Sequence, residues 1–265
     1  MIVTLLTDFG TADYFVGAMK GALLSINPRA AVVDITHEIA AHDIEAGAFT
    51  LLAAREAFPA GTVHVAVVDP GVGSERRALG AEAGGQFFVG PDNGLFSYVF
   101  ERAGRSPRVF HLTNREYFRE SVSTTFHGRD VFAPVAAHLS AGARLEDIGP
   151  PVEDWARLAP LTPRAAPDGA LEASVIHIDR FGNCVTSLTR RELTEEMIAR
   201  GAALSVNGRT VRAFRRFFAD EAAGANPLFA VWGSAGFLEL AAFRASAAEL
   251  LGARRGQIVR VTSDG

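Results

Sequence analysis

The sequence is poor in cysteine and in lysine, and each shortage excludes a class of site. Cys184 is the single cysteine among 265 residues, so an intrachain disulfide and a metal site built from several cysteines are both excluded. Lys20 is the single lysine, and the 26 lysine and arginine residues are outnumbered by 30 aspartate and glutamate residues. The formal net charge of −4 provides no broad basic surface, so we expect no nucleic-acid partner.

Long apolar runs and a targeting signal are lacking as well. No apolar segment approaches the roughly 20 residues that a membrane-spanning helix needs, so we expect no membrane partner. The segment 1–8 has no basic residue and reaches an acid at Asp8, which is not typical of a secretory signal. Together with the single cysteine, these features predict a cytoplasmic protein.

The residues that are present form alternating strand and helix patterns. Hydrophobic residues make up 48% and charged residues 21%, the composition of a soluble globular protein with a substantial core. Apolar runs typical of strands cover 2–6, 31–35 and 63–68. Apolar residues at helical spacing cover 15–26, after a cap at Thr11 or Asp13, and 44–52. This alternation predicts a parallel sheet with right-handed crossovers.

Prolines mark a change of pattern in the second half of the chain. Five of them fall between residues 149 and 169, which predicts a linker over 151–169. Short strand patterns dominate after it, and Asn207-Gly208 between two of them is typical of a β-hairpin. We therefore predict an α/β N-terminal domain with a mostly parallel sheet over 1–150 and a smaller all-β, barrel-like C-terminal domain over 170–265.

The stretch 67–77 combines the end of a buried strand, a tight turn and charged residues. The apolar run ends at Asp69, and Pro70 with two glycines then forms a turn that leads to Arg76 and Arg77. Open α/β sheets bind ligands beyond the C-terminal ends of their strands. We expect Asp69 at such an end, with Arg76 or Arg77 folding back towards its carboxylate.

His127 precedes a further predicted helix, 131–139. An arginine fork orients a carboxylate, and a histidine takes up or passes on a proton near neutral pH. Asp69, Arg76 and His127 are therefore candidates for holding and polarising a water molecule. The residues alone leave an alternative open, in which an Asp-Arg pair closes the turn and the histidine caps the helix.

Other segments carry candidate ligand-binding residues. Asp8 follows the first strand, where acids often bind a ribose diol or a metal ion. Asp179, Phe181 and Asn183 follow a later strand, and the aromatic ring offers a stacking face for a purine, although a plain turn explains the same residues. Ser234 lies in a loop of small residues, for which a simple hairpin is the alternative.

A metal site built from Asp8, His37, Asp69 and His127 is an alternative use of the same strand ends. These residues show neither the His-x-His nor the Glu-x-x-His spacing that is typical of metal ligands. We therefore predict no bound metal ion.

Five motifs occur in order along the chain and cover essentially all of it. They are Leu6 to Gly10, Asp69 to Gly73 followed by Arg76 and Arg77, Phe126 to Asp130, Asp179 to Asn183, and Leu238 to Leu251. As an ordered set they resemble the S-adenosyl-L-methionine (SAM) hydroxide adenosyltransferases, which are relatives of the bacterial fluorinase and chlorinase. The resemblance implies an N-terminal α/β domain, a barrel-like C-terminal domain and a homotrimer with its sites at subunit interfaces.

The reaction implied by the resemblance is attack of water or hydroxide on the ribose C5′ of SAM. This in-line SN2 displacement gives adenosine and L-methionine, with SAM as substrate and no cofactor. Asp69, Arg76 and His127 match the family's water-activating set. The matching substrate-binding positions are Asp8, Phe126, Asp179, Phe181, Asn183 and Ser234. The halogenases resemble Ser-Arg at the last position, where this chain has Ser234-Ala235.

Three other functions stay open at this point. A halogenase is disfavoured because fluorinase-like enzymes place a tyrosine where this chain has Asp69, whose carboxylate repels a halide and binds water. A metal-dependent hydrolase would use the same Asp and His residues and would lose activity with a chelator. A non-catalytic adenosine-binding or SAM-binding protein would retain its ligand without converting it, and the ordered Asp-Arg-His set disfavours this function.

Overall fold

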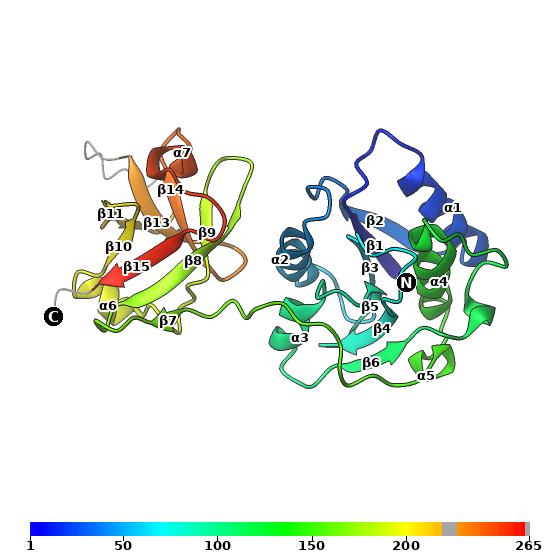
Figure 1. The fold of residues 1–265 in the computed structure, drawn as a ribbon. Coiled ribbons are helices and arrows are strands. Elements are labelled where there is room, and N and C mark those ends of the chain that lie inside the picture. The colour runs from blue at the N-terminus through cyan, green and yellow to red at the C-terminus, as the bar shows by residue number, and fades with distance from the viewer. Residues whose placement is uncertain (219–226, 263–265) are drawn as a thin grey trace. The chain divides into compact units, whose positions relative to one another are not determined.

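The computed structural model describes residues 1–218 and 227–262, and the chain divides into two compact units, Met1–Pro160 and Leu161–Gly265 (Figure 1). The division falls inside the segment 151–169, for which the prolines predict a linker. Each unit has its own sheet and its own hydrophobic core. The predicted fold class, an α/β domain followed by a mainly β domain, is confirmed.

The N-terminal unit is built on a six-stranded sheet with the order β2-β1-β3-β5-β4-β6. The strands are β1 (Ile2–Thr7), β2 (Ala31–Thr36), β3 (Val63–Val67), β4 (Ala78–Ala83), β5 (Gln86–Pro91) and β6 (Arg108–His111). The first four strands in this order pair in parallel, whereas β4 pairs antiparallel with β5 and β6. Because β1 and β3 are parallel neighbours, Asp8 and Asp69 both follow strands that end at the same edge of the sheet.

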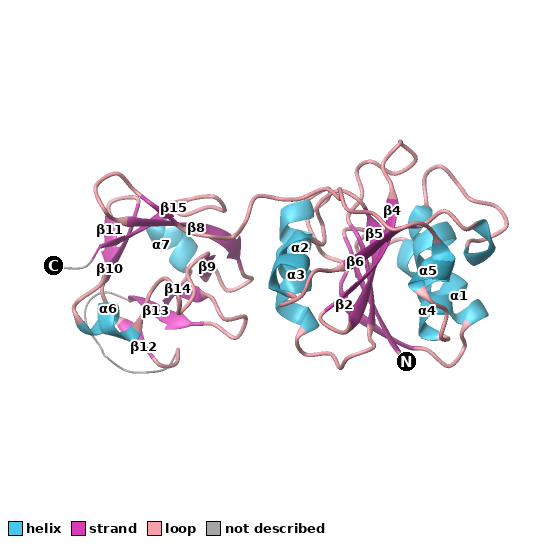
Figure 2. Ribbon diagram, turned by 90° about the horizontal axis from the view of Figure 1, so that it is seen from below, coloured by secondary structure: helices cyan, strands magenta, loops and turns pink. Residues whose placement is uncertain are grey.

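Helices cover both faces of this sheet (Figure 2). One face carries α1 (Phe15–Ile26), α4 (Ala133–Ser140) and α5 (Leu145–Ile148), and the other carries α2 (Ile44–Arg55) and α3 (Ser97–Arg102). The predicted cap of α1 at Thr11 or Asp13 is wrong, since the helix begins after Tyr14, which makes no side-chain cap bond. The Thr11 hydroxyl instead lies 3.4 Å from a carboxylate oxygen of Glu38.

The core between the sheet and the α1 and α4 face is aliphatic. Leu5 and Val65 from the sheet join Met19 and Leu23 from α1 and Val135 from α4, and all five side chains are fully buried. Burial of each such side chain contributes about 1.5–3 kcal/mol to stability, so this core holds the sheet and its strand ends in place.

Among the described residues, no helix has the length and apolar character that crossing a membrane requires.

The sheet of the C-terminal unit curls into a partial barrel with the strand order β11-β10-β15-β8-β9-β14-β13-β12, and β7 pairs with β8. The strands are β7 (Arg164–Ala165), β8 (Leu171–Ile178), β9 (Cys184–Thr186), β10 (Ala203–Val206), β11 (Arg209–Val211), β12 (Phe214–Arg215), β13 (Leu228–Trp232), β14 (Leu238–Ala242) and β15 (Ile258–Thr262). Two short helices, α6 (Glu195–Ala199) and α7 (Ala247–Leu251), complete the described part.

The hairpin predicted at Asn207-Gly208 is confirmed. Val206 of β10 pairs with Arg209 of β11 directly across a two-residue turn. Asn207 has φ 50° and Gly208 has φ 76°, as a type I′ turn requires at its two central positions.

Candidate active site

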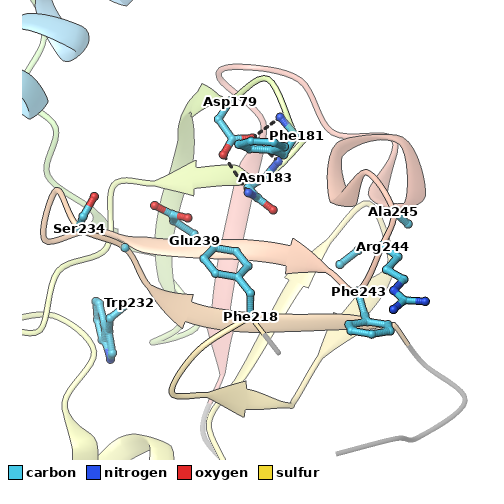
Figure 3. Close-up of a pocket in the computed structure, with 12 residues that line it drawn as sticks. Asp179, Phe181, Asn183, Phe218, Trp232, Ser234, Glu239, Phe243, Arg244 and Ala245 are labelled. Carbon is cyan, nitrogen blue, oxygen red and sulfur yellow. Dashed lines mark hydrogen bonds between the residues drawn. The ribbon is translucent and has the colours of Figure 1, made fainter. Parts of the chain in front are cut away.

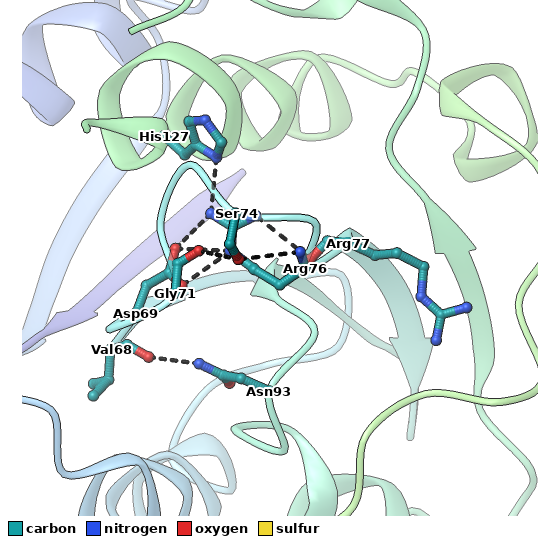
Figure 4. Close-up of polar contacts among 8 residues, drawn as sticks. All are labelled: Val68, Asp69, Gly71, Ser74, Arg76, Arg77, Asn93 and His127. Atoms are coloured by element: carbon teal, nitrogen blue, oxygen red, sulfur yellow. Dashed lines mark hydrogen bonds and ion pairs between the residues drawn. The ribbon is translucent and has the colours of Figure 1, made fainter. Parts of the chain in front are cut away.

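Asp69 lies two residues beyond the end of β3, in a turn that is shaped by its own hydrogen bonds (Figure 4). The Val72 N–H donates to the Asp69 carbonyl over 3.2 Å. Ser74 closes the turn, because its N–H and its hydroxyl donate to the Gly71 carbonyl over 3.1 and 2.7 Å. The chain then reverses and brings Arg76 back to Asp69.

Arg76 holds the Asp69 carboxylate with two nitrogens of its guanidinium. Nε lies 3.0 Å from Oδ1 and 3.1 Å from Oδ2, and Nη2 lies 2.5 Å from Oδ2. The two side chains are only 10% and 4% exposed, so water screens this ion pair little. Charge-assisted hydrogen bonds of this kind are strong and directional, and they fix the orientation of the carboxylate.

Arg76 also joins His127 to the pair, since Nη2 lies 2.8 Å from His127 Nδ1. A guanidinium has donors only, so Nδ1 accepts, and the neutral ring carries its proton on Nε2. Burial lowers the pKa of His127 below its usual value, and the charge of Arg76 lowers it further, while Asp69 and Asp130 act in the opposite direction. The neutral imidazole is therefore the form that fits this contact.

The backbone around His127 packs tightly against the turn. Gly73 has φ 78°, and a Cβ at this position would lie 2.2 Å from the carbonyl oxygen of Thr124. Asp130 is fully buried and accepts a 2.9 Å hydrogen bond from the Ser123 N–H, which closes the segment 123–130 on itself. The structure thus brings together the three residues proposed to hold water, while their catalytic roles stay predictions.

Asp8 and Phe126 are both held by neighbouring residues. The Oδ2 atom of Asp8 accepts a 2.9 Å hydrogen bond from the N–H of His42. Phe126 is 7% exposed and lies in an aromatic cluster, with ring centroids 6.0 Å from Phe9 and 5.2 Å from Phe15. Their roles as substrate contacts stay predictions.

His37 belongs to a hydrogen-bonded network at the ends of β1 and β2. Its Nδ1 lies 2.9 Å from the Thr7 hydroxyl, and its Nε2 lies 3.1 Å from an oxygen of Asp34. Within residues 1–218 and 227–262, no group of three or more His, Cys, Asp or Glu side chains is arranged to hold a metal ion.

The C-terminal unit contains an open pocket of about 860 Å³ (Figure 3). The Asp179 carboxylate accepts hydrogen bonds from the Phe181 N–H over 2.8 Å, the Asn183 N–H over 2.9 Å and the Asn183 side-chain amide over 2.8 Å. This turn buries Asn183 and leaves Phe181 78% exposed as a stacking surface. Ser234 also lines the pocket, so one cavity collects all four residues predicted in this unit.

Sequence reasoning missed several residues of this pocket. The additional lining includes Phe218, Trp232, Glu239, Phe243 and Arg244. Glu239 lies on β14 between the buried residues Leu238 and Leu240. Burial raises the pKa of its carboxyl group, and the charge of Asp179 raises it further. An acid inside an otherwise apolar strand is the sequence signal that could have identified it.

Comparisons with known proteins extend these observations over both units. The family models described as the SAM hydroxide adenosyltransferase N-terminal and C-terminal domains match residues 3–149 and 173–260. A Thermus thermophilus protein named (R)-S-adenosyl-L-methionine hydrolase is 42% identical, over 98% of each chain. A fluorinase from Actinopolyspora mzabensis is 29% identical over 98% of this chain and 97% of its own. The crystal structure of an uncharacterized conserved protein from Thermotoga maritima matches with a TM-score of 0.90 and 33% identity, covering 98% of this chain and 99% of that one.

Proposed function

This chain belongs to the SAM hydroxide adenosyltransferase family, and we propose that it hydrolyses SAM to adenosine and L-methionine. The observation that carries the proposal is the hydrogen-bonded chain Asp69–Arg76–His127, which holds a carboxylate beyond the end of a buried strand. In the reaction, a water oxygen forms a bond to the ribose C5′ while the C5′–S bond breaks. The bonding electron pair leaves with sulfur, which becomes the neutral thioether of methionine, and the water loses one proton.

The substrate itself simplifies the chemistry, because sulfur leaves from a sulfonium cation and needs no acid or metal to activate it. The protein has to place a water molecule in line with the C5′–S bond and to accept its proton. Such positioning contributes about 7–11 kcal/mol to lowering a barrier. Bulk water has a pKa of about 15.7 and is a poor nucleophile. We therefore propose a metal-independent, cofactor-free SN2 displacement.

Asp69 is the proton acceptor in this mechanism. His127 Nδ1 is occupied by the donor of Arg76, and Nε2 of the neutral ring already carries a proton, so the imidazole has no free acceptor. A carboxylate has about four lone-pair sites, more than the contacts with Arg76 use. Arg76 thus orients Asp69, and His127 holds the guanidinium from its other side.

The proposed substrate contacts follow the family resemblance. Asp8 binds the ribose, Phe126 contributes an aromatic edge, and Asp179, Phe181 and Asn183 contact the adenosine and methionine moieties. Ser234 binds the amino-acid end. The exposed ring of Phe181 and the size of the pocket suit a purine nucleoside. We also propose that the protein is cytoplasmic and forms a homotrimer with its sites at subunit interfaces. Light scattering after size-exclusion chromatography tests the trimeric state.

The test is incubation of chelator-treated protein with SAM in ¹⁸O-labelled water, followed by mass spectrometry of the nucleoside. The expected products are methionine and adenosine that carries the label at its 5′ oxygen. Intact SAM, or a bound nucleoside that is never released as product, would contradict the proposal in favour of a binding protein. Loss of turnover on chelation would instead favour a metal-dependent hydrolase, and a halogenated nucleoside formed with added halide would favour a halogenase.

A further inference from the structure

The backbone that enters the turn after β3 is held by a side chain from the turn after β5. Val68 lies one residue beyond β3 and directly precedes Asp69. The side-chain amide of Asn93, in the turn after β5, donates to the Val68 carbonyl over 2.8 Å (Figure 4). Its Oδ1 accepts the Leu95 N–H over 3.2 Å, which fixes the orientation of the amide. The position of the Val68 carbonyl, directly before Asp69, therefore depends on the hydrogen bond from Asn93.

The backbone that leaves the turn is held by Asp92, the residue that precedes Asn93. The Asp92 N–H donates to the Arg77 carbonyl over 2.9 Å, and Arg77 Nε returns a 2.7 Å bond to the Asp92 carboxylate. The other guanidinium nitrogens of Arg77 donate to the carboxylate and the carbonyl of Asp154 over 2.7 and 2.8 Å. Arg77 thus extends away from Asp69, while Arg76 extends towards it (Figure 4).

Two consecutive residues, Asp92 and Asn93, therefore fasten both ends of the segment 69–76. Most residues in the middle of this segment are exposed. The backbone hydrogen bonds of its turn join residues of the segment to one another and not to the rest of the domain. In the middle of the segment, Gly73 lies close to the Thr124 carbonyl. Because Asp69 stands at the first end of the segment, the position of its carboxylate depends most directly on how that end is held.

We propose that Asn93 is a positioning residue for the hydrolysis, because its amide places the Val68 carbonyl and thereby the Asp69 carboxylate against the attacking water. The proposal rests on the function proposed above. Displacement of a reacting group by about 1 Å can cost about 10²-fold in rate. A single hydrogen bond, by contrast, contributes little to the stability of a whole domain. A positioning role therefore predicts a loss of rate that exceeds any loss of stability.

The sharpest variant is Asn93→Asp, which keeps the shape of the side chain and the acceptor for the Leu95 N–H but removes the donor to Val68. We expect kcat for SAM to fall by about 10- to 100-fold, with KM within about 2-fold of the wild type. The matched control is Gln86→Glu, which makes the same chemical change. The Gln86 amide is buried and donates to the backbone carbonyls of residues 55 and 58 over 3.0 and 2.9 Å, away from the catalytic turn. The control is expected to lower the unfolding temperature and to keep kcat.

A folded Asn93→Asp variant with wild-type kcat would overturn the proposal, as would an equal loss of kcat in Gln86→Glu. If Asn93→Asp does not fold, Arg77→Lys loosens the other end of the segment, since a single ammonium nitrogen cannot reach the three acceptor atoms that three separate guanidinium nitrogens contact. Arg108→Lys is its control, because Arg108 bridges Glu82 and Glu146 elsewhere on the sheet. We expect a lower kcat for Arg77→Lys and an unchanged kcat for Arg108→Lys.

A readout that needs no turnover separates this proposal from the proposed function. The imidazole NMR signals of His127, assigned with a His127→Gln variant, report the Arg76 contact directly. We expect them to shift in Asn93→Asp and to stay in place in Gln86→Glu. A wild-type protein that leaves SAM intact would refute the function alone, whereas unchanged His127 signals in Asn93→Asp would refute the positioning role.

Discussion

Replacing Asp69 by asparagine is expected to remove most catalysis and little ligand binding. The change keeps the shape of the side chain but removes the charge that faces Arg76 at 2.5 to 3.1 Å. General-base catalysis contributes about 10²–10⁴-fold, so kcat should fall by that factor. This loss corresponds to a rise of about 2.7–5.4 kcal/mol in the activation free energy. Because Arg76 is only 10% exposed and loses its anionic partner, the free energy of unfolding should fall by up to about 3–5 kcal/mol.

The assay combines initial rates of adenosine and methionine formation with calorimetric titration of SAM into each protein. Glu82→Gln is the control, because Glu82 also pairs with an arginine, Arg108, at 2.8 Å, on a different part of the same sheet. This control should keep the wild-type kcat. A folded Asp69→Asn protein with wild-type kcat, or with a changed KM alone, would refute the assignment of Asp69 as proton acceptor.

Four further predictions concern His127, its pKa, Gly73 and, in the C-terminal unit, Cys184. Replacing His127 by alanine should lower kcat by about 10²-fold or more, because the guanidinium of Arg76 loses the contact that holds it opposite Asp69, while a titration shows ligand binding largely intact. Because burial and then the neighbouring guanidinium lower the pKa of His127, kcat/KM should be flat above pH 6.5 and fall only below it. The folded protein should also lose stability below about pH 6.5, since the unfolded chain takes up the proton first; a decline that begins near pH 8 would contradict this assignment. Gly73→Ala should lower both the unfolding temperature and kcat, because the new Cβ meets the Thr124 carbonyl at 2.2 Å, whereas Gly104→Ala, with a similar φ of 70° and open space around it, should lower the unfolding temperature less and leave kcat unchanged. Burial raises the pKa of Cys184 to about 11, so a thiol reagent at pH 8 should label it only after the protein is unfolded in urea, and rapid labelling of the folded protein would contradict its burial.

Asp69 and His127 could be selected from the sequence because a local pattern marks each of them. Asp69 follows a β-branched run, a glycine-containing turn comes next, and His127 stands just before a helical segment. The turn pattern alone does not separate Arg76 from Arg77, and Arg76 is chosen because it matches the family's water-activating set. Both follow an irregular turn, and only the three-dimensional positions of Asp69 and Asp92 separate their roles.

Features that depend on distant contacts stayed outside the reach of sequence patterns. Strand β4 consists mainly of small residues and lacks β-branched side chains, so its propensity is weak. It is a strand because β5 and β6 pair with it on both sides. The role of Asn93 was hidden for the same reason, since its partner Val68 lies 25 residues away in the chain.

We expect the charge of Asp69 to influence which nucleophile this site accepts. The fold alone does not select the nucleophile, because a fluorinase aligns with 98% of the chain. The carboxylate charge alone repels a halide about 4 Å away by about 4 kcal/mol at an effective dielectric constant of 20. The guanidinium of Arg76 offsets part of this repulsion, because its charge lies next to the carboxylate. Most of its N–H groups face Asp69, His127 and the Arg77 carbonyl, so it offers a halide little direct hydrogen bonding. Water, which donates hydrogen bonds, is attracted by the same carboxylate, so we expect this site to favour hydrolysis over halogenation.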